Sequence, residues 1–365
     1  MKSVTTACAA LAFATAGAAP EAEGVAAAPA AAASAPRAWI TVPRIAGRLT
    51  ARDLGLVINT ADPYSVEVGE AYAAARRLGP DQVLRVELPV RASLTAEEFQ
   101  QFDARIRDHF GADTQALALA WKLPYAVACN SITGALALGV DLGRCTALCS
   151  PSRPSPYFGM PSARPYTDLK MRPSMLLAAR DAAQAKALIQ RGLDAERSLG
   201  LRGAPPVHAH FVVTDDKSRS VRAPLFPPPG RIARFGLEVH VDRTQALENV
   251  DRVLLYETGL PRVDKLDTVG FVPGALADHL TSYGGQLDEP SQQMSVLAWI
   301  EAGATASYGS VSEPCAHAQK FPHPQVLLLT YVQGATAIEA YWKSVAWPQQ
   351  GLFVGDPLAA PFAHR

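Results

Sequence analysis

Short apolar runs alternate with helix-like stretches from residue 52 onward. The run Leu54–Asn59 is apolar almost throughout and leads to the N-cap candidate Asp62, a pattern typical of a buried strand followed by a helix. The elements predicted in this half are strands at Leu54–Asn59, Gln82–Leu88 and Gln115–Leu123, and helices at Ser65–Leu78 and Ser93–Phe110. Their alternating order predicts an α/β fold, with a mainly parallel sheet flanked by helices on both faces.

The second half of the chain continues the same alternation. A helix is expected near Ser174–Leu199 and two more at Gln292–Ala302 and Thr336–Val345. Strands are expected at Val207–Thr214, Arg252–Glu257, Ala275–Ser282, Ala304–Ser310 and Leu352–Val354. The pattern leaves open whether these strands form one sheet or two half-sheets. Between the halves, residues 142–173 are rich in Pro, Ser and Arg and predict a long ordered excursion from a single α/β domain at 41–365.

The first forty residues differ in composition from the rest. Residues 1–18 resemble a signal peptide, with Lys2 ahead of a modest apolar stretch and a small-residue cleavage site at Ala16-Gly17-Ala18. Residues 19–40 form an Ala/Pro-rich spacer with little that can pack. No later segment offers 18 consecutive apolar residues, so we expect no transmembrane span. The prediction is an exported protein, periplasmic or extracellular.

Charge and composition narrow the possible partners. The 365 residues include 34 Lys and Arg against 34 Asp and Glu, and 48% of the residues are hydrophobic. A disordered chain would be less apolar and more highly charged, so most of this chain can bury a core. The neutral balance lacks the basic surface expected of a protein that binds nucleic acid. The oligomeric state cannot be predicted from these features.

Four cysteines remain after the predicted cleavage: Cys129, Cys145, Cys149 and Cys315. In an oxidising compartment an even number favours disulfides, and four cysteines allow three pairings. The short spacing from Cys145 to Cys149 makes this pair the first guess, with Cys129–Cys315 as a long-range link. A zinc site is the alternative, although the spacing matches no common zinc motif.

The common cofactor motifs are absent. The sequence contains no dinucleotide-binding glycine fingerprint, P-loop, HExxH or GxSxG, so we expect no cofactor. His208 and His210 would share one face of a strand, as would His240 and Asp242, and the four side chains would suit a metal ion if the two segments were neighbours. We favour hydrogen-bonded strand histidines instead, and assign no metal.

The segment Gly274–Gly285, with the sequence GALADHLTSYGG, holds the most unusual residues. Its Gly284-Gly285 pair predicts a turn with close backbone approach at the end of a strand, where open α/β sheets bind ligands. Ser282 is therefore a candidate nucleophile, and Tyr283 with the two glycines are candidate binding residues. Asp278, His279 and Ser282 cannot form a triad on one regular strand, because alternate residues face opposite sides.

A base for Ser282 would have to come from a bulge or from another strand end. The candidates are His279 after a local bulge and Glu313, which follows the strand predicted at Ala304–Ser310. Asp356, in the Gly355-Asp356-Pro357 turn, is a candidate binding residue, although a carboxylate at this position often only accepts loop N–H groups.

Several segments resemble an uncharacterised family of exported bacterial proteins whose species distribution follows the exosortase protein-sorting system. They are LGLVINTADPYSVEVGEAYAAARRL, GALADHLTSYGG, AWIEAGATASYGSVSEP, FPHP, GATAIEAYW and VGDP, in this order over residues 50–362. More distantly, the C-terminal part resembles the gingipain-type cysteine peptidases. That resemblance implies a caspase-like three-layer arrangement and a His–Cys dyad on neighbouring strand ends.

The matched positions lack this dyad. Ser282 stands where the gingipain-type nucleophilic cysteine would be, and Leu260 stands where the histidine would be. The resemblance therefore implies a peptidase-like fold without the dyad, which binds a protein or peptide in the cell envelope and is linked to protein sorting. The alternatives are a serine hydrolase that uses Ser282 and a structural envelope protein.

Overall fold

One sheet of eleven strands organises the computed structural model, which describes residues 37–288 and 293–364. The strand order is β2-β1-β4-β7-β14-β13-β12-β11-β8-β10-β9, and the antiparallel ladders are β13 with β14 and β10 with β9. The α/β class and the mainly parallel sheet are thus confirmed, and the strands form one large sheet rather than two half-sheets. Residues 1–18 and 19–36 of the predicted leader and spacer lie outside the described residues.

The first half follows the predicted alternation closely. Its elements are β1 (Leu54–Asn59), α1 (Pro63–Arg76), β2 (Val83–Val86), β3 (Ser93–Leu94), α2 (Ala96–His109), β4 (Ala116–Leu119), β5 (Ala126–Val127), β6 (Asn130–Ser131), α3 (Ile132–Leu138) and α4 (Pro165–Leu169). The N-terminus of α2 carries a capping box, in which the Thr95 hydroxyl accepts from the Glu98 N–H at 3.2 Å and the Glu98 carboxylate accepts from the Thr95 N–H at 2.8 Å. Strands β3, β5 and β6 form a separate small sheet.

In the second half two helices were predicted to start too early, and several elements were not predicted. The helix predicted at Gln292–Ala302 begins only at Leu297, and Gln292 itself lies outside the described residues. Its elements are β7 (Ser174–Leu176), α5 (Ala182–Asp194), β8 (Val207–Val213), β9 (Gly230–Ile232), β10 (Leu237–Arg243), β11 (Val250–Thr258), β12 (Val269–His279), α6 (Leu297–Glu301), β13 (Ala306–Ser310), α7 (Pro324–Val332), α8 (Ala337–Ser344) and β14 (Gly351–Gly355). The helix predicted near Ser174–Leu199 was wrong at its start. Residues 174–176 instead form β7 between β4 and β14, and the helix begins only after the N-cap Asp181.

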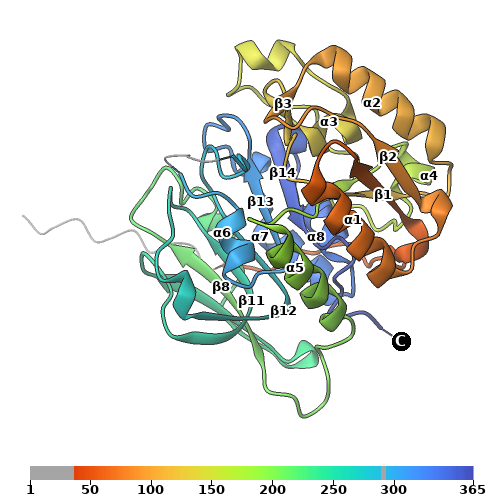
Figure 1. The fold of residues 1–365 in the computed structure, drawn as a ribbon. Coiled ribbons are helices and arrows are strands. Elements are labelled where there is room, and N and C mark those ends of the chain that lie inside the picture. The colour runs from red at the N-terminus through yellow and green to blue at the C-terminus, as the bar shows by residue number, and fades with distance from the viewer. Residues whose placement is uncertain (1–36, 289–292, 365) are drawn as a thin grey trace, which may run out of the picture. The chain divides into compact units, whose positions relative to one another are not determined.

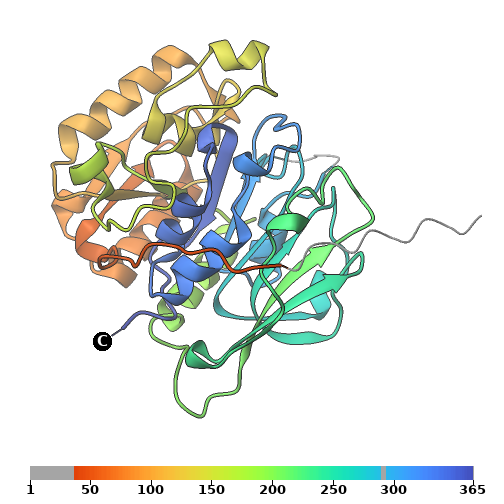
Figure 2. The ribbon, with the colours of Figure 1, turned by 180° about the vertical axis from the view of Figure 1, so that it is seen from behind.

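Helices cover both faces of the sheet. Figures 1 and 2 show α1, α5 and α6 on one face and α7 and α8 on the other. Both α7 and α8 are buried along nearly their whole length, with Trp342 of α8 stacked on Phe353 of β14 at a centroid distance of 4.2 Å. This covering explains why the central strands, such as β14, are buried at every position.

An extended segment, residues 37–49, crosses α7 and α8, and we call it the strap (Figure 2). Side chains from α7, its C-cap and α8 hold its backbone, together with one isolated β-bridge in which the Ala46 N–H donates to the Pro161 carbonyl at 2.9 Å. The N–H groups of Ile40 and Ile45 donate to the side-chain oxygens of Gln325 and Gln333 at 2.9 and 3.1 Å. Farther along, the Leu49 N–H donates to the Glu339 carboxylate at 3.1 Å.

The disulfides correct the pairing guessed from spacing. They join Cys129 to Cys145, with Cα atoms 5.4 Å apart, and Cys149 to Cys315, with Cα atoms 5.2 Å apart. Cys145 lies within the 3₁₀ turn Gly143–Thr146 and Cys149 follows it, and the two cysteines bond to different parts of the domain. Both bonds therefore fasten the 142–173 excursion to the body of the protein. None of the described helices has the length and apolar character needed to cross a bilayer.

Candidate functional site

His279, the last residue of β12, has both ring nitrogens engaged. The indole N–H of Trp299 donates to its Nδ1 at 2.9 Å, so the proton lies on Nε2, which donates to the Met294 carbonyl at 3.0 Å. The side chain is fully buried, and burial lowers its pKa to about 3. The lone pair of Nδ1 is already used by Trp299, so this neutral imidazole has none left to accept a proton from Ser282. Its two hydrogen bonds instead hold the end of β12 in place.

Ser282 lies in a turn fixed by hydrogen bonds to its backbone. The N–H groups of Ser282 and Tyr283 approach the Gln293 side-chain oxygen at 2.8 and 3.4 Å, and the Ser310 hydroxyl donates to the Ser282 carbonyl at 2.8 Å. Among the described residues, no hydrogen bond joins the Ser282 hydroxyl to a histidine. The described contacts thus position the backbone of Ser282.

The Gly284-Gly285 pair provides the close backbone approach that the sequence predicts. The Gly285 N–H donates to the Ser310 carbonyl at 2.9 Å. A Cβ atom on Gly285 would lie only 2.6 Å from the Gly309 carbonyl oxygen. A larger residue would therefore push the turn away from β13.

Glu313 and Asp356 are each tied into local structure. The Glu313 carboxylate accepts from the Cys315 N–H at 2.7 Å, beside the second disulfide. Asp356 is fully buried, where its two oxygens accept from Arg76 at 2.8 and 2.9 Å and one of them also accepts from the Leu358 N–H. Its pKa is raised by burial, against the opposing charge of Arg76. Among the described residues, no hydrogen bond joins either carboxylate to Ser282.

Sequence reasoning missed a buried charge cluster beneath these strand ends. Glu257 of β11 and Asp278 of β12 are register partners on neighbouring strands, and both are fully buried. The Arg222 guanidinium lies 2.7 Å from Asp278 and 3.4 Å from Glu257. Burial raises the pKa of both carboxyls against the opposing charge of Arg222, and the charge of Asp278 raises the pKa of Glu257 further. The only signal in the sequence was a carboxylate inside each of two otherwise apolar runs.

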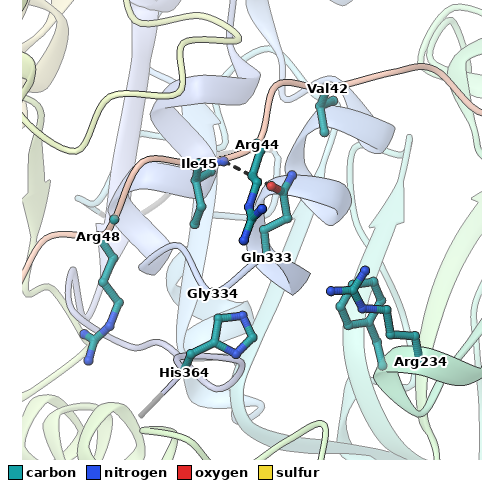
Figure 3. A pocket seen from close by; sticks show the side chains of 10 residues that line it. Val42, Arg44, Ile45, Arg48, Arg234, Gln333, Gly334 and His364 are labelled. Atoms are coloured by element: carbon teal, nitrogen blue, oxygen red, sulfur yellow. Dashed lines mark hydrogen bonds between the residues drawn. The ribbon is translucent and has the colours of Figure 1, made fainter.

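A cavity of about 530 Å³ lies between the strap, α7 and the end of the chain (Figure 3), and we call it the strap pocket. Arg44 and Arg48 come from the strap, Arg234 from the 3₁₀ turn Ala233–Phe235, and His364 from the C-terminal tail. Figure 3 shows Arg44 beside Gln333, between Arg48 and Arg234 and above His364. Val42, Ile45 and Phe235 supply apolar wall, and none of the ten lining residues is acidic.

A second cavity of about 660 Å³ adjoins the strap pocket, since Arg234, Phe235 and His364 line both. Its other walls include the apolar Leu199, Leu201 and Phe362 and the charged Glu196 and Arg197. Leu201 is 60% exposed, a large fraction for an apolar side chain. Together the two cavities form a groove that is cationic at one end and has both apolar and charged walls at the other.

A smaller cavity, of about 160 Å³, lies where several strands end. Lys122, Arg180 and Arg262 follow β4, β7 and β11, and they line it together with Asp288. Two of these cations already have partners, because Arg180 pairs with Glu301 at 2.6 Å and Lys122 donates to the Arg180 carbonyl at 2.8 Å. This cavity is therefore a weaker candidate for an anionic ligand than the strap pocket.

Comparison with known proteins gives few relatives. No protein-family model matches the chain, and no curated protein matches it. Among solved structures, the chain is similar to the Arg-specific cysteine proteinase gingipain R, with 12% sequence identity and a TM-score of 0.44 over 85% of this chain and 78% of that one. The α/β class of this protein follows from its own sheet, and the link to exosortase systems stays a prediction.

Proposed function

We propose that this protein is an exported binding protein that holds an acidic peptide segment in the strap pocket. The observation that carries the proposal is the set of three arginines and one histidine around a cavity without an acidic lining residue. Guanidinium groups bind carboxylates through paired, charge-assisted hydrogen bonds, and a concave surface of one sign attracts ligands of the other.

The groove favours a peptide over a small anion. The neighbouring cavity extends the site past Arg234 toward Leu199, Leu201 and Phe362, which gives room for apolar side chains next to the carboxylates. The expected ligand is a segment with two or more acidic residues followed by apolar ones. Two disulfides are compatible with an exported protein, because such bonds persist in oxidising compartments.

Binding without chemistry agrees with the contacts near Ser282. Both nitrogens of His279 are engaged, and Glu313 accepts from a backbone N–H. The alternative, a serine hydrolase, predicts labelling by a fluorophosphonate probe that disappears in Ser282→Ala. That result would replace the binding proposal with a catalytic one.

Isothermal titration with two synthetic peptides tests the proposal. The first is an acetylated and amidated peptide of three glutamates followed by leucine and phenylalanine, and the second has lysines in place of the glutamates. We expect saturable binding of the first alone, weakened by at least about tenfold in an Arg44→Gln/Arg234→Gln variant. Arg107→Gln, on the exposed face of α2, is the matched control and should bind as the wild type does.

Equal binding of both peptides would contradict the proposal, as would an unchanged affinity in the double variant. The third interpretation, a structural envelope protein, predicts that neither peptide binds. Circular dichroism of each variant verifies that the fold is intact, so a loss of binding can be assigned to the pocket.

A further inference from the structure

Five side chains with metal-binding chemistry gather on one face of β8 and β10. They are His208 and His210 on β8, and Glu238, His240 and Asp242 on β10. The parallel register pairs His208 with Glu238 and His210 with His240. Because side chains alternate along a strand, all five project from the same face of the sheet. The two segments that the sequence could not place together are therefore neighbours.

Three of these residues bring their ligand atoms to a common point. The donor atoms of His208, Glu238 and His240 all lie within 4.8 Å of one another. The Nδ1 atom of His208 lies 3.0 Å from Nε2 of His240 and 3.8 Å from a Glu238 oxygen. Two imidazole nitrogens bound to one zinc ion at about 2.0–2.1 Å each lie about 3.3 Å apart in a tetrahedral site. The observed spacing is close to that geometry.

The remaining two residues brace the group. The ring of His210 stacks on that of His240, with centroids 4.6 Å apart and planes inclined by 13°. The Nδ1 atom of His210 lies 2.9 Å from an Asp242 oxygen, which holds the stacked ring in place. Neighbours that fix the orientation of a ligating ring are a regular feature of protein metal sites.

An ion can reach this cluster from solvent. The side chains of His208 and Glu238 are 25% and 34% exposed, so the donor atoms are sheltered but not sealed. Glu238 and Asp242 together bring two negative charges, which match a divalent cation. Arg252 is the cation that acts on His208 from β11, and it is tied to the Pro206 carbonyl by a 2.8 Å hydrogen bond.

We propose that His208, Glu238 and His240 form a zinc site, with the remaining coordination positions taken by water. Two imidazoles and one carboxylate suit Zn²⁺ and related transition metals, whereas Mg²⁺ and Ca²⁺ prefer sites made of oxygen ligands alone. The site is independent of the strap pocket, since the two share no residue.

Titration of metal-stripped protein without an affinity tag tests the site. Zinc is added in the presence of a chromophoric chelator, and Co²⁺ is titrated separately while its visible absorption is recorded. We expect one tightly bound Zn²⁺ per chain, not displaced by millimolar Ca²⁺ or Mg²⁺, and tetrahedral or five-coordinate Co²⁺ bands. Zinc affinity should fall at least about 100-fold in His240→Gln and in Glu238→Gln, because each loses a direct ligand.

Two control variants separate this site from adventitious binding. His109→Gln removes an exposed histidine on α2 and should leave zinc affinity unchanged. His210→Asn keeps all three ligands and should weaken binding less than His240→Gln does. The proposal is overturned if the wild-type protein binds no zinc, or if the ligand variants bind as tightly as the wild type. Circular dichroism confirms that each variant is folded.

Discussion

The indole N–H of Trp299 donates to Nδ1 of His279 across 2.9 Å in the buried core. Burial keeps the imidazole neutral, although the hydrogen bond from Nε2 to the Met294 carbonyl opposes this effect. Its pKa of about 3 lies below the ordinary value of 6.5. Between these two values the imidazole is protonated in the unfolded chain but not in the folded one. The contribution of this group to the free energy of unfolding is therefore constant above the pKa of the unfolded chain. It decreases as the pH falls from that value toward the pKa of the folded chain.

The first prediction follows from that difference. Between about pH 6.5 and pH 5 the free energy of unfolding should fall by about 1.4 kcal/mol per pH unit from this group. His279→Asn should be less stable at neutral pH but should lose this part of the slope. Urea unfolding at a series of pH values measures both effects. His109→Asn, at an exposed position, should keep the wild-type slope, and equal slopes in both variants would count against the assignment.

The second prediction concerns the Arg222 cluster. Glu257 lies farther from the guanidinium than Asp278 does, so we expect Glu257 to carry the proton. Glu257→Gln should then change stability by less than about 1 kcal/mol below the ordinary pKa of 4.5, where the unfolded chain also holds the proton, because an amide resembles the protonated acid. Arg222→Met should cost about 3–5 kcal/mol, since it leaves a buried carboxylate without a partner.

The pH dependence of Glu257 has the opposite sign to that of His279. A raised folded pKa means that the folded chain holds the proton more firmly, so stability falls as the pH rises above the ordinary value of 4.5. The free energy of unfolding of Glu257→Gln should therefore rise relative to that of the wild type as the pH increases from about 5 to about 8. Chemical denaturation of both proteins at those two pH values measures this difference in stability. A variant that is more stabilised relative to the wild type at the lower pH would refute the assignment.

The third prediction tests the packing of Asp356 against α5. A Cβ atom on Gly192 would lie 2.2 Å from an Asp356 oxygen, inside the buried pair with Arg76. Gly192→Ala should destabilise the protein by about 2–3 kcal/mol through this overlap. Gly111→Ala is the control, because its Cβ would meet no atom within 4 Å. Thermal unfolding of both variants decides the point, and equal melting temperatures would show that α5 moves aside freely.

The fourth prediction concerns the disulfides. Peptide mapping without reduction should recover Cys129 with Cys145 and Cys149 with Cys315, and no other pair. Their closing loops span 16 and 166 residues, so replacing each pair by serines should cost about 3 and about 5 kcal/mol, respectively. Recovery of a Cys145–Cys149 peptide, or four free thiols, would contradict the structure.

Much of the sheet could be predicted because its strands are continuous apolar runs. β1 was predicted at its observed bounds, and β8 to within one residue. β7 was missed because three residues give no measurable period, and its strand state depends on neighbours β4 and β14. β10 was not among the predicted strands, although His240 and Asp242 were considered as strand residues and its alternating polar side chains are typical of a strand near the sheet edge.

The candidate sites could be predicted only in part. The histidines of β8 and β10 were recognised as possible metal ligands. Whether they contact one another depends on β8 and β10 being neighbours in the sheet, and the spacing of residues within a strand does not determine strand order. The strap pocket left no trace in the sequence, since Arg44, Arg234 and His364 come from three distant segments. Cysteine spacing suggested the wrong disulfides for a related reason: a short separation says nothing about the direction of the two side chains.

The way the strap is fastened has a mechanical consequence. Its backbone is held by separate contacts along its length, namely the side chains of Gln325, Gln333 and Glu339 and one bond from the Ala46 N–H to the Pro161 carbonyl. A pulling force applied ahead of Arg37 would break these contacts one after another. The hydrogen bonds of a strand within a ladder would instead have to break together. Peeling to Leu49 would carry Arg44 and Arg48 away from the pocket, and with them most of its positive charge.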